Sequence, residues 1–251
     1  MRFLRLTIAY DGSNYFGWQW QPDRPTVQGV LEAAINKVTG ESIRATASGR
    51  TDAGVHALGQ AVSIVTKSRL EPEVLCRALN ANLPRDVLVH EICAAPEGFN
   101  AIRGAVGKRY RYVVQDDPLP DLFTRRYCWH VRGGRLDAEL MHQAAQSLRG
   151  EQDFMGYEAA GSERVSTVRT VCDISVIRRA YQDGERVVLE VEADGFLYNM
   201  VRNIVGTLVQ VGRKRRSVDW PREVLEGRDR RQAGMTAPAH GLYMVRVLFD
   251  F

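Results

Sequence analysis

The residues best suited to chemistry lie in the segment Gly49-Arg50-Thr51-Asp52-Ala53-Gly54-Val55-His56-Ala57. Its glycines allow tight turns and let a ligand come close to the backbone, and the segment lies between a predicted helix and a predicted strand, where sites often form. Asp52 is the candidate reactive carboxylate, because a carboxylate can be a nucleophile at a sugar carbon, a general base or a metal ligand. An aspartate beside a glycine can also simply cap its own turn.

The sequence offers little support for a metal or a cofactor beside this carboxylate. His56 follows four residues later, but the chain has five histidines and no HExxH, HxH or DxD pairing. The GxxxxGK[ST], GxSxG and GxGxxG motifs are absent, which weighs against a nucleotide triphosphatase, a serine hydrolase and a dinucleotide enzyme. We therefore expect no metal and no cofactor, with Asp52 acting through its own pKa and position.

Two further groups of residues combine polar and aromatic character. In a strand, the tyrosines of Lys108-Arg109-Tyr110-Arg111-Tyr112 share one face and the arginines share the other. A base can then stack on an aromatic ring while a phosphate is held nearby, although aromatics at this spacing are also typical of a core. In 195–206, four residues lie opposite an apolar helix face: Asn199, Arg202, Asn203 and Gly206. Such an arginine can lie against another element and pair with a buried carboxylate.

The composition is that of a globular chain of 251 residues, 45% apolar and 25% charged, with a formal net charge of +4. Its 30 arginines against four lysines favour a nucleic-acid partner, because the planar guanidinium binds phosphate in a bidentate manner. A GC-rich genome gives the same bias. Basic clusters lie in the second half, at 108–111, 125–126, 213–216 and 228–231. They indicate either a phosphate-binding surface or a solvated face.

The cysteines and the N-terminus bear on the compartment of the protein. The four cysteines, at positions 76, 93, 128 and 172, are too widely spaced for a zinc or redox motif, so we expect buried free thiols. The first residues alternate between apolar and polar and do not resemble a signal peptide. No apolar run approaches the roughly 20 residues that span a bilayer. The sequence therefore predicts a cytoplasmic protein with no membrane partner.

Apolar spacing predicts a similar order of elements in both halves of the chain. Strands are expected at 4–10, 61–66 and 87–93, with helices at 27–38 and 71–82. In the second half, strands are expected at 110–114, 168–178, 187–193 and 243–249, with helices from Asp137 to Gly150 and at 197–208. This order predicts an α+β fold of two similar α/β sandwich halves, ferredoxin-like or RRM-like, around a central, mostly antiparallel sheet with the catalytic cleft between them. We expect the halves to be residues 1–103 and 104–251.

Six segments, in order, resemble the landmarks of the tRNA pseudouridine synthase A family and cover nearly the whole chain. They are YDGSNYFGWQWQ at 10–21, TVQG at 26–29, GRTDAGVHA at 49–57, KRYRY at 108–112, FLYNMVRNIVGTL at 196–208 and APAHGLYMVRV at 237–247. The resemblance implies an isomerase without metal or cofactor that converts uridine to pseudouridine in the anticodon stem-loop of tRNA, at tRNA positions 38 to 40. It also implies a homodimer in which each tRNA contacts both subunits.

The resemblance carries roles to four residues of this chain. Asp52 matches the catalytic aspartate, which attacks the ribose or the base so that uracil detaches, rotates and rejoins through carbon. Tyr110 matches the tyrosine that packs on the target base, and Arg202 matches the basic residue that pairs with the aspartate. Arg50 matches a residue that enters the RNA as the base flips out. Two alternatives stay open: an RNA-binding module without catalysis, and a metal-dependent phosphodiesterase that uses Asp52 and His56.

Two stretches depart from the family pattern. Before the KRYRY segment, Ala101-Ile102-Arg103-Gly104 shifts an arginine and lacks an aromatic residue. After Asp153-Phe154, the usual phenylalanine-rich spacing is replaced by Met155-Gly156-Tyr157. Neither stretch contains one of the four matched residues, and we assign no RNA contact to either.

Overall fold

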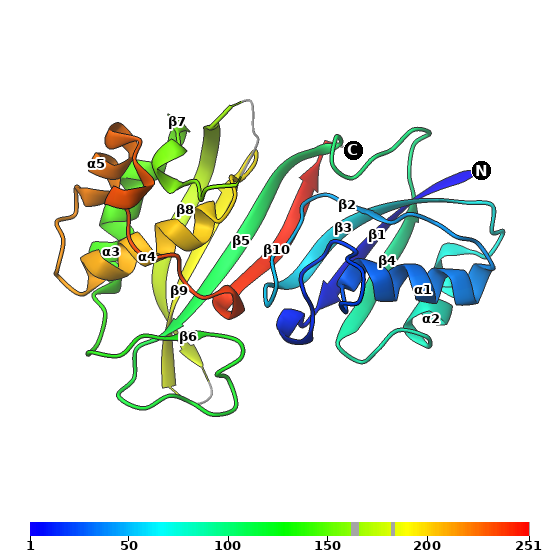
Figure 1. Cartoon of the computed structure of the whole chain (residues 1–251), viewed down its shortest axis with the longest axis horizontal. Helices are drawn as coiled ribbons and strands as arrows, with labels where there is room; N and C mark the ends of the chain where they lie inside the picture. The colour runs from blue at the N-terminus through cyan, green and yellow to red at the C-terminus, as the bar shows by residue number, and fades with distance from the viewer. Residues whose placement is uncertain (162–165, 182–183, 251) are drawn as a thin grey trace. The chain divides into compact units, whose positions relative to one another are not determined.

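The computed structural model describes residues 1–161, 166–181 and 184–250. The chain forms two compact units (Figure 1). The first consists of Met1–Val106 together with Tyr243–Phe251, and the second is Gly107–Leu242. The end of the chain therefore belongs with its beginning.

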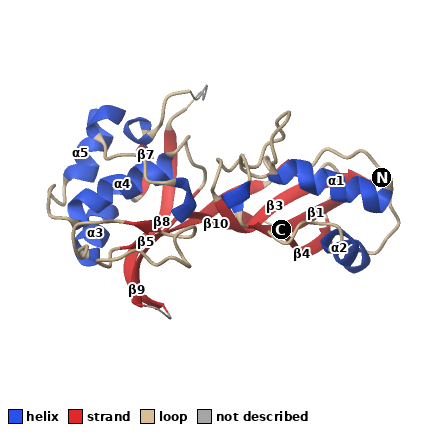
Figure 2. Cartoon of the chain, turned by 60° about the horizontal axis from the view of Figure 1, so that its bottom comes forward, coloured by secondary structure: helices blue, strands red, loops and turns tan. Residues whose placement is uncertain are grey.

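The first unit is built on an antiparallel sheet. Its strands are β1 (Arg2–Tyr10), β2 (Thr46–Ala47), β3 (His56–Thr66) and β4 (Val87–Ala94), joined by β10 (Leu242–Phe249). β1 lies between β3 and β4 and is antiparallel to both, and β2 is antiparallel to β3. β10 is parallel to β3, with Tyr243 opposite His56. With α1 (Val27–Thr39) after β1 and α2 (Pro72–Asn80) after β3, this unit has the βαββαβ order of a ferredoxin-like sandwich (Figure 2).

Local sequence signals explain the first strand and helix of this unit. The even-numbered residues of β1 from Leu4 to Tyr10 are buried, as the alternation predicts for a strand with one face on the core. Thr26 caps α1, because its hydroxyl oxygen accepts the Gly29 N–H at 3.2 Å. The helix ends at Gly40, which has φ of 72° and adopts the left-handed conformation that glycine tolerates without strain. These local signals account for the buried face of β1 and for the first and last residues of α1.

The second unit also combines a sheet with helices, in a different order of elements. Its strands are β5 (Ala105–Gln115), β6 (Trp129–His130), β7 (Gly150–Asp153), β8 (Val168–Tyr181) and β9 (Gly184–Ala193). Its helices are α3 (Ala138–Ala145), α4 (Met200–Gly212) and α5 (Trp220–Gly227). The sheet order is β5-β9-β8-β7 with antiparallel neighbours, and β6 pairs in parallel with β5. The three helices contact one another, so they form one layer.

The structure corrects three sequence predictions in this unit. The helix expected from residue 197 begins at Met200, because Asn199 has φ of 58° and is left-handed. The helix that follows Asp137 ends at Ala145, and a 3₁₀ turn (Gln146–Leu148) leads into β7 at Gly150. The sequence missed α5, whose eight residues are too short for a clear helical period.

The α+β class and the mostly antiparallel sheet are confirmed. All four cysteines are free, but the prediction that they are buried holds only for Cys128, since Cys172 is exposed and the other two are intermediate. Within the described ranges, no helix has both the length and the apolar character needed to span a membrane.

Candidate active site

Asp52 lies in a tight turn between β2 and β3. The turn closes through the main chain, where the Asp52 carbonyl oxygen accepts the Val55 N–H at 3.1 Å. Gly54 has φ of 78°, a conformation that favours glycine and lets the chain reverse before β3. Asp52 itself is half-buried. The turn therefore holds this carboxylate on a short, constrained loop with partial access to solvent.

The N-terminal segment that follows β1 holds this loop from one side. The Tyr10 hydroxyl and Thr51 Oγ1 are 2.7 Å apart, and the Trp18 N–H donates to the Thr51 carbonyl at 3.0 Å. Gly17 has φ of 84°, and a Cβ there would lie 2.5 Å from that same carbonyl oxygen and 3.1 Å from the Asp52 carbonyl carbon. Burial raises the pKa of Tyr10 to about 12, so this hydroxyl stays protonated. Only glycine at position 17 permits so close an approach.

A buried glutamine holds the other side of the loop. Gln60 is fully buried in β3, where its Oε1 accepts the Ser48 hydroxyl at 2.8 Å and its amide donates to the Gly49 carbonyl at 2.7 Å. Arg50 follows this anchor directly. Its side chain is exposed and makes no hydrogen bond or ion pair with the described residues. The structure thus fixes the backbone at Arg50 and leaves its guanidinium in solvent.

The two tyrosines of the KRYRY segment share one face of β5, as the sequence predicts. Tyr112 is fully buried, donates to the Pro238 carbonyl at 2.7 Å and packs on Gly241, where a Cβ would lie 2.6 Å from its ring. Tyr110 is 8% exposed and meets the Phe196 ring edge to face, with centroids 4.9 Å apart. Tyr112 is therefore a core residue, whereas Tyr110 keeps a small exposed area.

The arginines on the opposite face of β5 are occupied by carboxylates. Arg109 pairs with Glu192 and Asp173 at 2.9 Å each and with Glu190 at 3.2 Å, and Arg111 pairs with Glu190 at 2.7 Å. Burial alone would raise the pKa of Glu190, but the hydrogen bonds and charges of the arginines more than offset it and hold the pKa below its usual value. The sequence left these arginines as possible phosphate ligands. The structure instead places them in ion pairs within the sheet.

Arg202 lies in the first turn of α4 and is fixed by two acceptors. Its Nη1 donates to Asn199 Oδ1 and its Nε donates to the Ala237 carbonyl, both at 2.7 Å. The segment that supplies this carbonyl packs against the helix backbone. A Cβ on Gly206 would lie 1.7 Å from the Met235 carbonyl oxygen. The absence of a side chain at Gly206 therefore lets this segment approach the helix closely.

A buried polar network secures the same segment from within. Asn203 is fully buried, and its Oδ1 accepts from Arg230 at 2.9 Å and from the Thr236 hydroxyl at 2.7 Å. Its amide donates to the Tyr157 carbonyl at 2.7 Å. The sequence placed Asn203 opposite the apolar face without a role. Its burial on all sides shows that the helix is enclosed.

The four residues singled out by the sequence thus fall into two pairs. Asp52 and Arg50 share one loop of the first unit. Tyr110, on β5, and Arg202, on α4, belong to the second unit.

The comparisons with known proteins agree on one family. The sequence model of the family described as tRNA pseudouridine synthase matches residues 6–102 and 144–250. This chain belongs to that family. A tRNA pseudouridine synthase A of Moorella thermoacetica is 46% identical over 98% of this chain and 99% of its own length. Those of Brevibacillus brevis and Thermoanaerobacter sp. strain X514 are 44% and 41% identical, each over 99% of this chain and 100% of its own length.

The two stretches that depart from the family pattern have structural roles here. Gly156 packs on α5, where a Cβ would lie 2.4 Å from the Val224 carbonyl oxygen, and the buried Tyr157 donates to the Pro221 carbonyl at 3.0 Å. Near the other stretch, the Phe99 ring lies beside Gly104 and meets Phe249 edge to face at 5.5 Å. An aromatic residue five positions before Gly104 therefore packs at this corner of the first unit.

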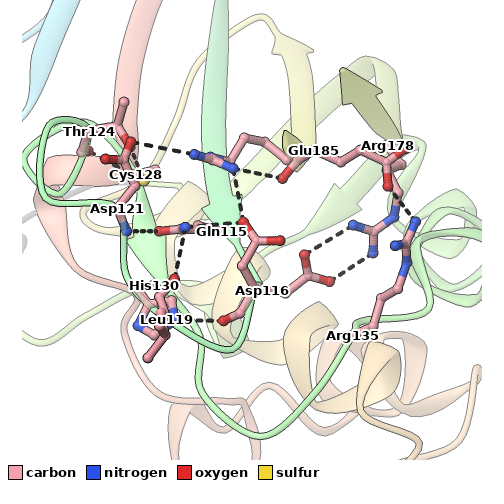
Figure 3. A network of polar contacts seen from close by, with 12 residues as sticks. Gln115, Asp116, Leu119, Asp121, Thr124, Cys128, His130, Arg135, Arg178 and Glu185 are labelled. Carbon is pink, nitrogen blue, oxygen red and sulfur yellow. Dashed lines mark hydrogen bonds and ion pairs between the residues drawn. The ribbon is translucent and has the colours of Figure 1, made fainter. Parts of the chain in front are cut away.

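A network of buried charged residues holds the long connection between β5 and α3 (Figure 3). Asp116 and Arg178 form two hydrogen bonds, of 3.0 and 2.8 Å, and Asp116 also accepts the Leu136 N–H at 2.6 Å. Arg186 is 1% exposed and pairs with Asp117 at 3.1 Å and with Asp121 at 3.6 Å. Although burial opposes it, the contacts of Asp116 with Arg178 and Leu136 hold the pKa of this carboxyl below its usual value. These groups anchor a loop.

Sequence reasoning assigned no role to the residues that hold the candidate site. Thr51 and Gln60 are buried polar residues inside or just after the GRTDAGVHA segment, and Asn199 precedes α4. Gln60 could have been noticed only as a polar residue at an inward-facing position of a strand. The sequence alone does not show that this position is buried. No group of three or more histidine, cysteine, aspartate or glutamate side chains in the described part of the chain is arranged to hold a metal ion.

Proposed function

We propose that this protein isomerises uridine to pseudouridine in tRNA, in the anticodon stem-loop at tRNA positions 38 to 40. The observation that carries the proposal is family membership over nearly the full length, with relatives 41–46% identical that are named tRNA pseudouridine synthase A. The GRTDAGVHA loop is intact and is held from both sides by buried hydrogen bonds.

The proposed reaction needs no oxidant, reductant or second substrate. The bond between uracil N1 and ribose C1′ breaks, the base turns, and a bond forms between C5 and C1′. C5 loses its hydrogen as a proton and N1 gains one, so the product is an isomer of the substrate. In this reaction Asp52 attacks either the ribose or the base, as the family resemblance implies. Its place on a short, half-buried loop supports this role.

The other matched residues take roles around the flipped base. Tyr110 packs on the uracil, which its aromatic character and its small exposed area support. Arg202 pairs with Asp52, supported by the two acceptors that fix its guanidinium. Arg50 enters the space left in the RNA, supported by its exposure on a fixed backbone. Base flipping costs a few kcal/mol of unstacking, which the stacking tyrosine and the inserted arginine offset.

The proposal includes the organisation of the protein. The N-terminal half, residues 1–103, supplies the aspartate loop, and the C-terminal half, residues 104–251, supplies the tyrosine and the arginine that act on the same uridine. The protein works as a homodimer in the cytoplasm, with each tRNA contacting both subunits. The family resemblance supports these points.

The test is to map pseudouridine in unmodified tRNA after incubation with the protein. The wild type forms pseudouridine within positions 38 to 40, and Asp52→Ala forms none while it still binds the tRNA. Asp23→Ala, at an exposed carboxylate of the same unit, serves as the control and keeps activity. An active Asp52→Ala contradicts the proposal. No pseudouridine from the wild type favours an RNA-binding module, and cleavage of RNA that stops with chelator favours a phosphodiesterase.

A further inference from the structure

The structure draws attention to His56, a buried histidine that the proposed reaction does not use. It is 2% exposed, begins β3 and lies four residues after Asp52. Its ring stacks on Tyr243 with centroids 4.9 Å apart. Its Nδ1 is 3.1 Å from the backbone nitrogen of Gly12 and 3.1 Å from Asp11 Oδ1. One ring nitrogen therefore faces both a donor and an acceptor.

Which contact forms a hydrogen bond depends on the proton at Nδ1. When Nδ1 carries none, it accepts the Gly12 N–H. When the ring is protonated, Nδ1 donates to the Asp11 carboxylate, and the Gly12 N–H loses this acceptor. The two bonds exclude each other, because Nδ1 accepts a hydrogen bond only when it carries no proton and donates one only when it carries a proton. Protonation of His56 thus replaces its hydrogen bond with the Gly12 N–H by one with the Asp11 carboxylate.

Gly12 connects this exchange to the loop that carries Asp52. The Gly12 backbone packs on Val55 so closely that a Cβ would lie 2.0 Å from the Val55 carbonyl oxygen. Val55 in turn donates its N–H to the Asp52 carbonyl at 3.1 Å. A shift of Gly12 is therefore passed through main-chain contacts to Asp52. Tyr10, two residues before Gly12, reaches the same loop through Thr51.

We propose that His56 is a positioning residue for the Asp52 loop and that its neutral form, which accepts the Gly12 N–H, is the form that supports turnover. The proposal rests on the proposed isomerase function. It concerns the geometry of the loop and assigns His56 no contact with the substrate. In the protonated form, the turn at Gly12 is released and Asp52 is displaced from its working position.

Several charged or titratable groups surround the imidazole and enter the test. Asp11 faces it from the end of β1, and Tyr243 faces it from β10. Behind Asp11, the Tyr15 hydroxyl donates to Asp86 at 2.5 Å, and the Asp11 N–H donates to the Asp86 carbonyl at 2.9 Å. The negative charge of Asp11 favours the protonated imidazole, so its removal extends the neutral form to lower pH.

The experiment compares His56→Asn with His56→Leu. The asparagine Oδ1 offers an acceptor near the place of Nδ1 but does not titrate in this range, whereas leucine offers no acceptor. We expect kcat of His56→Leu to fall roughly fivefold to tenfold, as for loss of one buried hydrogen bond, with KM for tRNA within about twofold. His56→Asn restores most of kcat at neutral pH, and the acid limb that protonation of His56 gives the wild type disappears.

Asp11→Asn gives an independent readout, because it changes the protonation of His56 without removing the ring. Its acid limb moves to lower pH than in the wild type. Nitrogen NMR of the imidazole follows the same change without any activity assay, and thermal unfolding verifies that each variant is folded. The proposal is overturned if His56→Asn is as slow as His56→Leu, or if the acid limb is unchanged in His56→Asn. A wild type that makes no pseudouridine at any pH instead contradicts the proposed function, while the NMR titration still tests the partner exchange.

Discussion

The loop that carries Asp52 and the helix turn that carries Arg202 are held in place by a different balance of contacts. The Asp52 loop relies on separate hydrogen bonds from Tyr10, Trp18 and Gln60 in addition to the close backbone approaches at Gly12 and Gly17. The Arg202 turn depends on a backbone packed directly on a backbone, where Gly206 meets the chain near Met235. Substitutions can remove these hydrogen bonds one at a time, at a cost of about 1 kcal/mol each. A Cβ added where two backbones touch cannot fit unless one backbone moves. Removal of single hydrogen bonds should therefore weaken the first region gradually, whereas a Cβ added at Gly206 should disrupt the second abruptly.

The substitution Gly206→Ala is the most severe test of this difference. The new Cβ would lie 1.7 Å from the Met235 carbonyl oxygen, so the segment that holds Arg202 must move away. We expect a loss of about 3 kcal/mol or more in the free energy of unfolding, together with most of the activity. Denaturant unfolding measures it. The control is Gly195→Ala, whose Cβ would meet only the flexible Arg169 side chain at 3.3 Å. An equal effect of the two variants contradicts the packing argument.

The two units should also differ in their stability at acid pH, because that stability depends on carboxyl groups with lowered pKa values. Hydrogen bonds and cations lower the pKa values of five carboxyls of the second unit, Asp116, Asp137, Asp153, Glu190 and Asp229, and hydrogen bonds lower that of Glu41 in the first. A lowered folded-state pKa contributes stability above the unfolded value of about 4, and this contribution is lost as pH falls through the folded value.

We therefore expect hydrogen exchange at pH 3 to expose β8 and β9 before β1 and β3. Asp116→Asn, which breaks the buried pair with Arg178, brings part of this loss to neutral pH and costs about 3 kcal/mol. Simultaneous loss of protection in both units would show that the charge difference does not set acid stability.

The hydrogen bond between Tyr10 and Thr51 gives a smaller effect. Tyr10→Phe leaves the Thr51 hydroxyl without this partner, and we expect a loss of about 1 kcal/mol in stability and roughly a fivefold fall in kcat. Thr51→Val should act in the same way, and the double variant should cost little more than either single one. A double-mutant cycle on unfolding and on kcat measures the coupling. Additive losses would mean that the two side chains act separately.

The smallest effect concerns RNA binding by the arginines. Arg109 is neutralised by three carboxylates, so Arg109→Ala should leave the slope of log Kd for tRNA against log salt unchanged. Arg50 is exposed, and its cation neutralises backbone charge when it enters the RNA, so Arg50→Ala should reduce the magnitude of that slope by about 0.7 to 0.9, the contribution of one neutralised phosphate. Fluorescence titrations at several salt concentrations measure both. A reduced slope for Arg109→Ala would show that this ion-pair network opens to RNA.

The sequence predicts best those parts of the fold that local signals direct. The alternation in β1, the Thr26 cap and the terminating Gly40 are all visible in the chain and all appear in the structure. The start of α4 is misplaced by three residues, because a left-handed Asn199 interrupts an apolar pattern that the sequence reads as continuous. Periodicity reports which face is apolar and does not report where a backbone reverses.

The candidate site, like the fold, has some features that local sequence predicts and others that it does not. Asp52 was found from its residue type and its place in a glycine-flanked segment, and Gly206 from its position opposite the apolar helix face. The carboxylate partners of Arg109 lie 64 to 83 residues further along the chain, and no local pattern reveals such pairs. The same holds for His56 and Gly12, which are 44 residues apart. Long-range polar contacts appear only when the fold brings distant segments together.

The central claim is that Asp52 drives the isomerisation, and the release of tritium from carbon 5 of labelled uridines tests it most directly. Each turnover replaces the hydrogen on C5 with the bond to ribose, so tritium passes to water. With excess unmodified tRNA, we expect the wild type to release tritium over many turnovers. Asp52→Asn should release it more slowly by a factor on the order of 10³, with unchanged tRNA affinity. Release by Asp52→Asn at the wild-type rate would contradict the account.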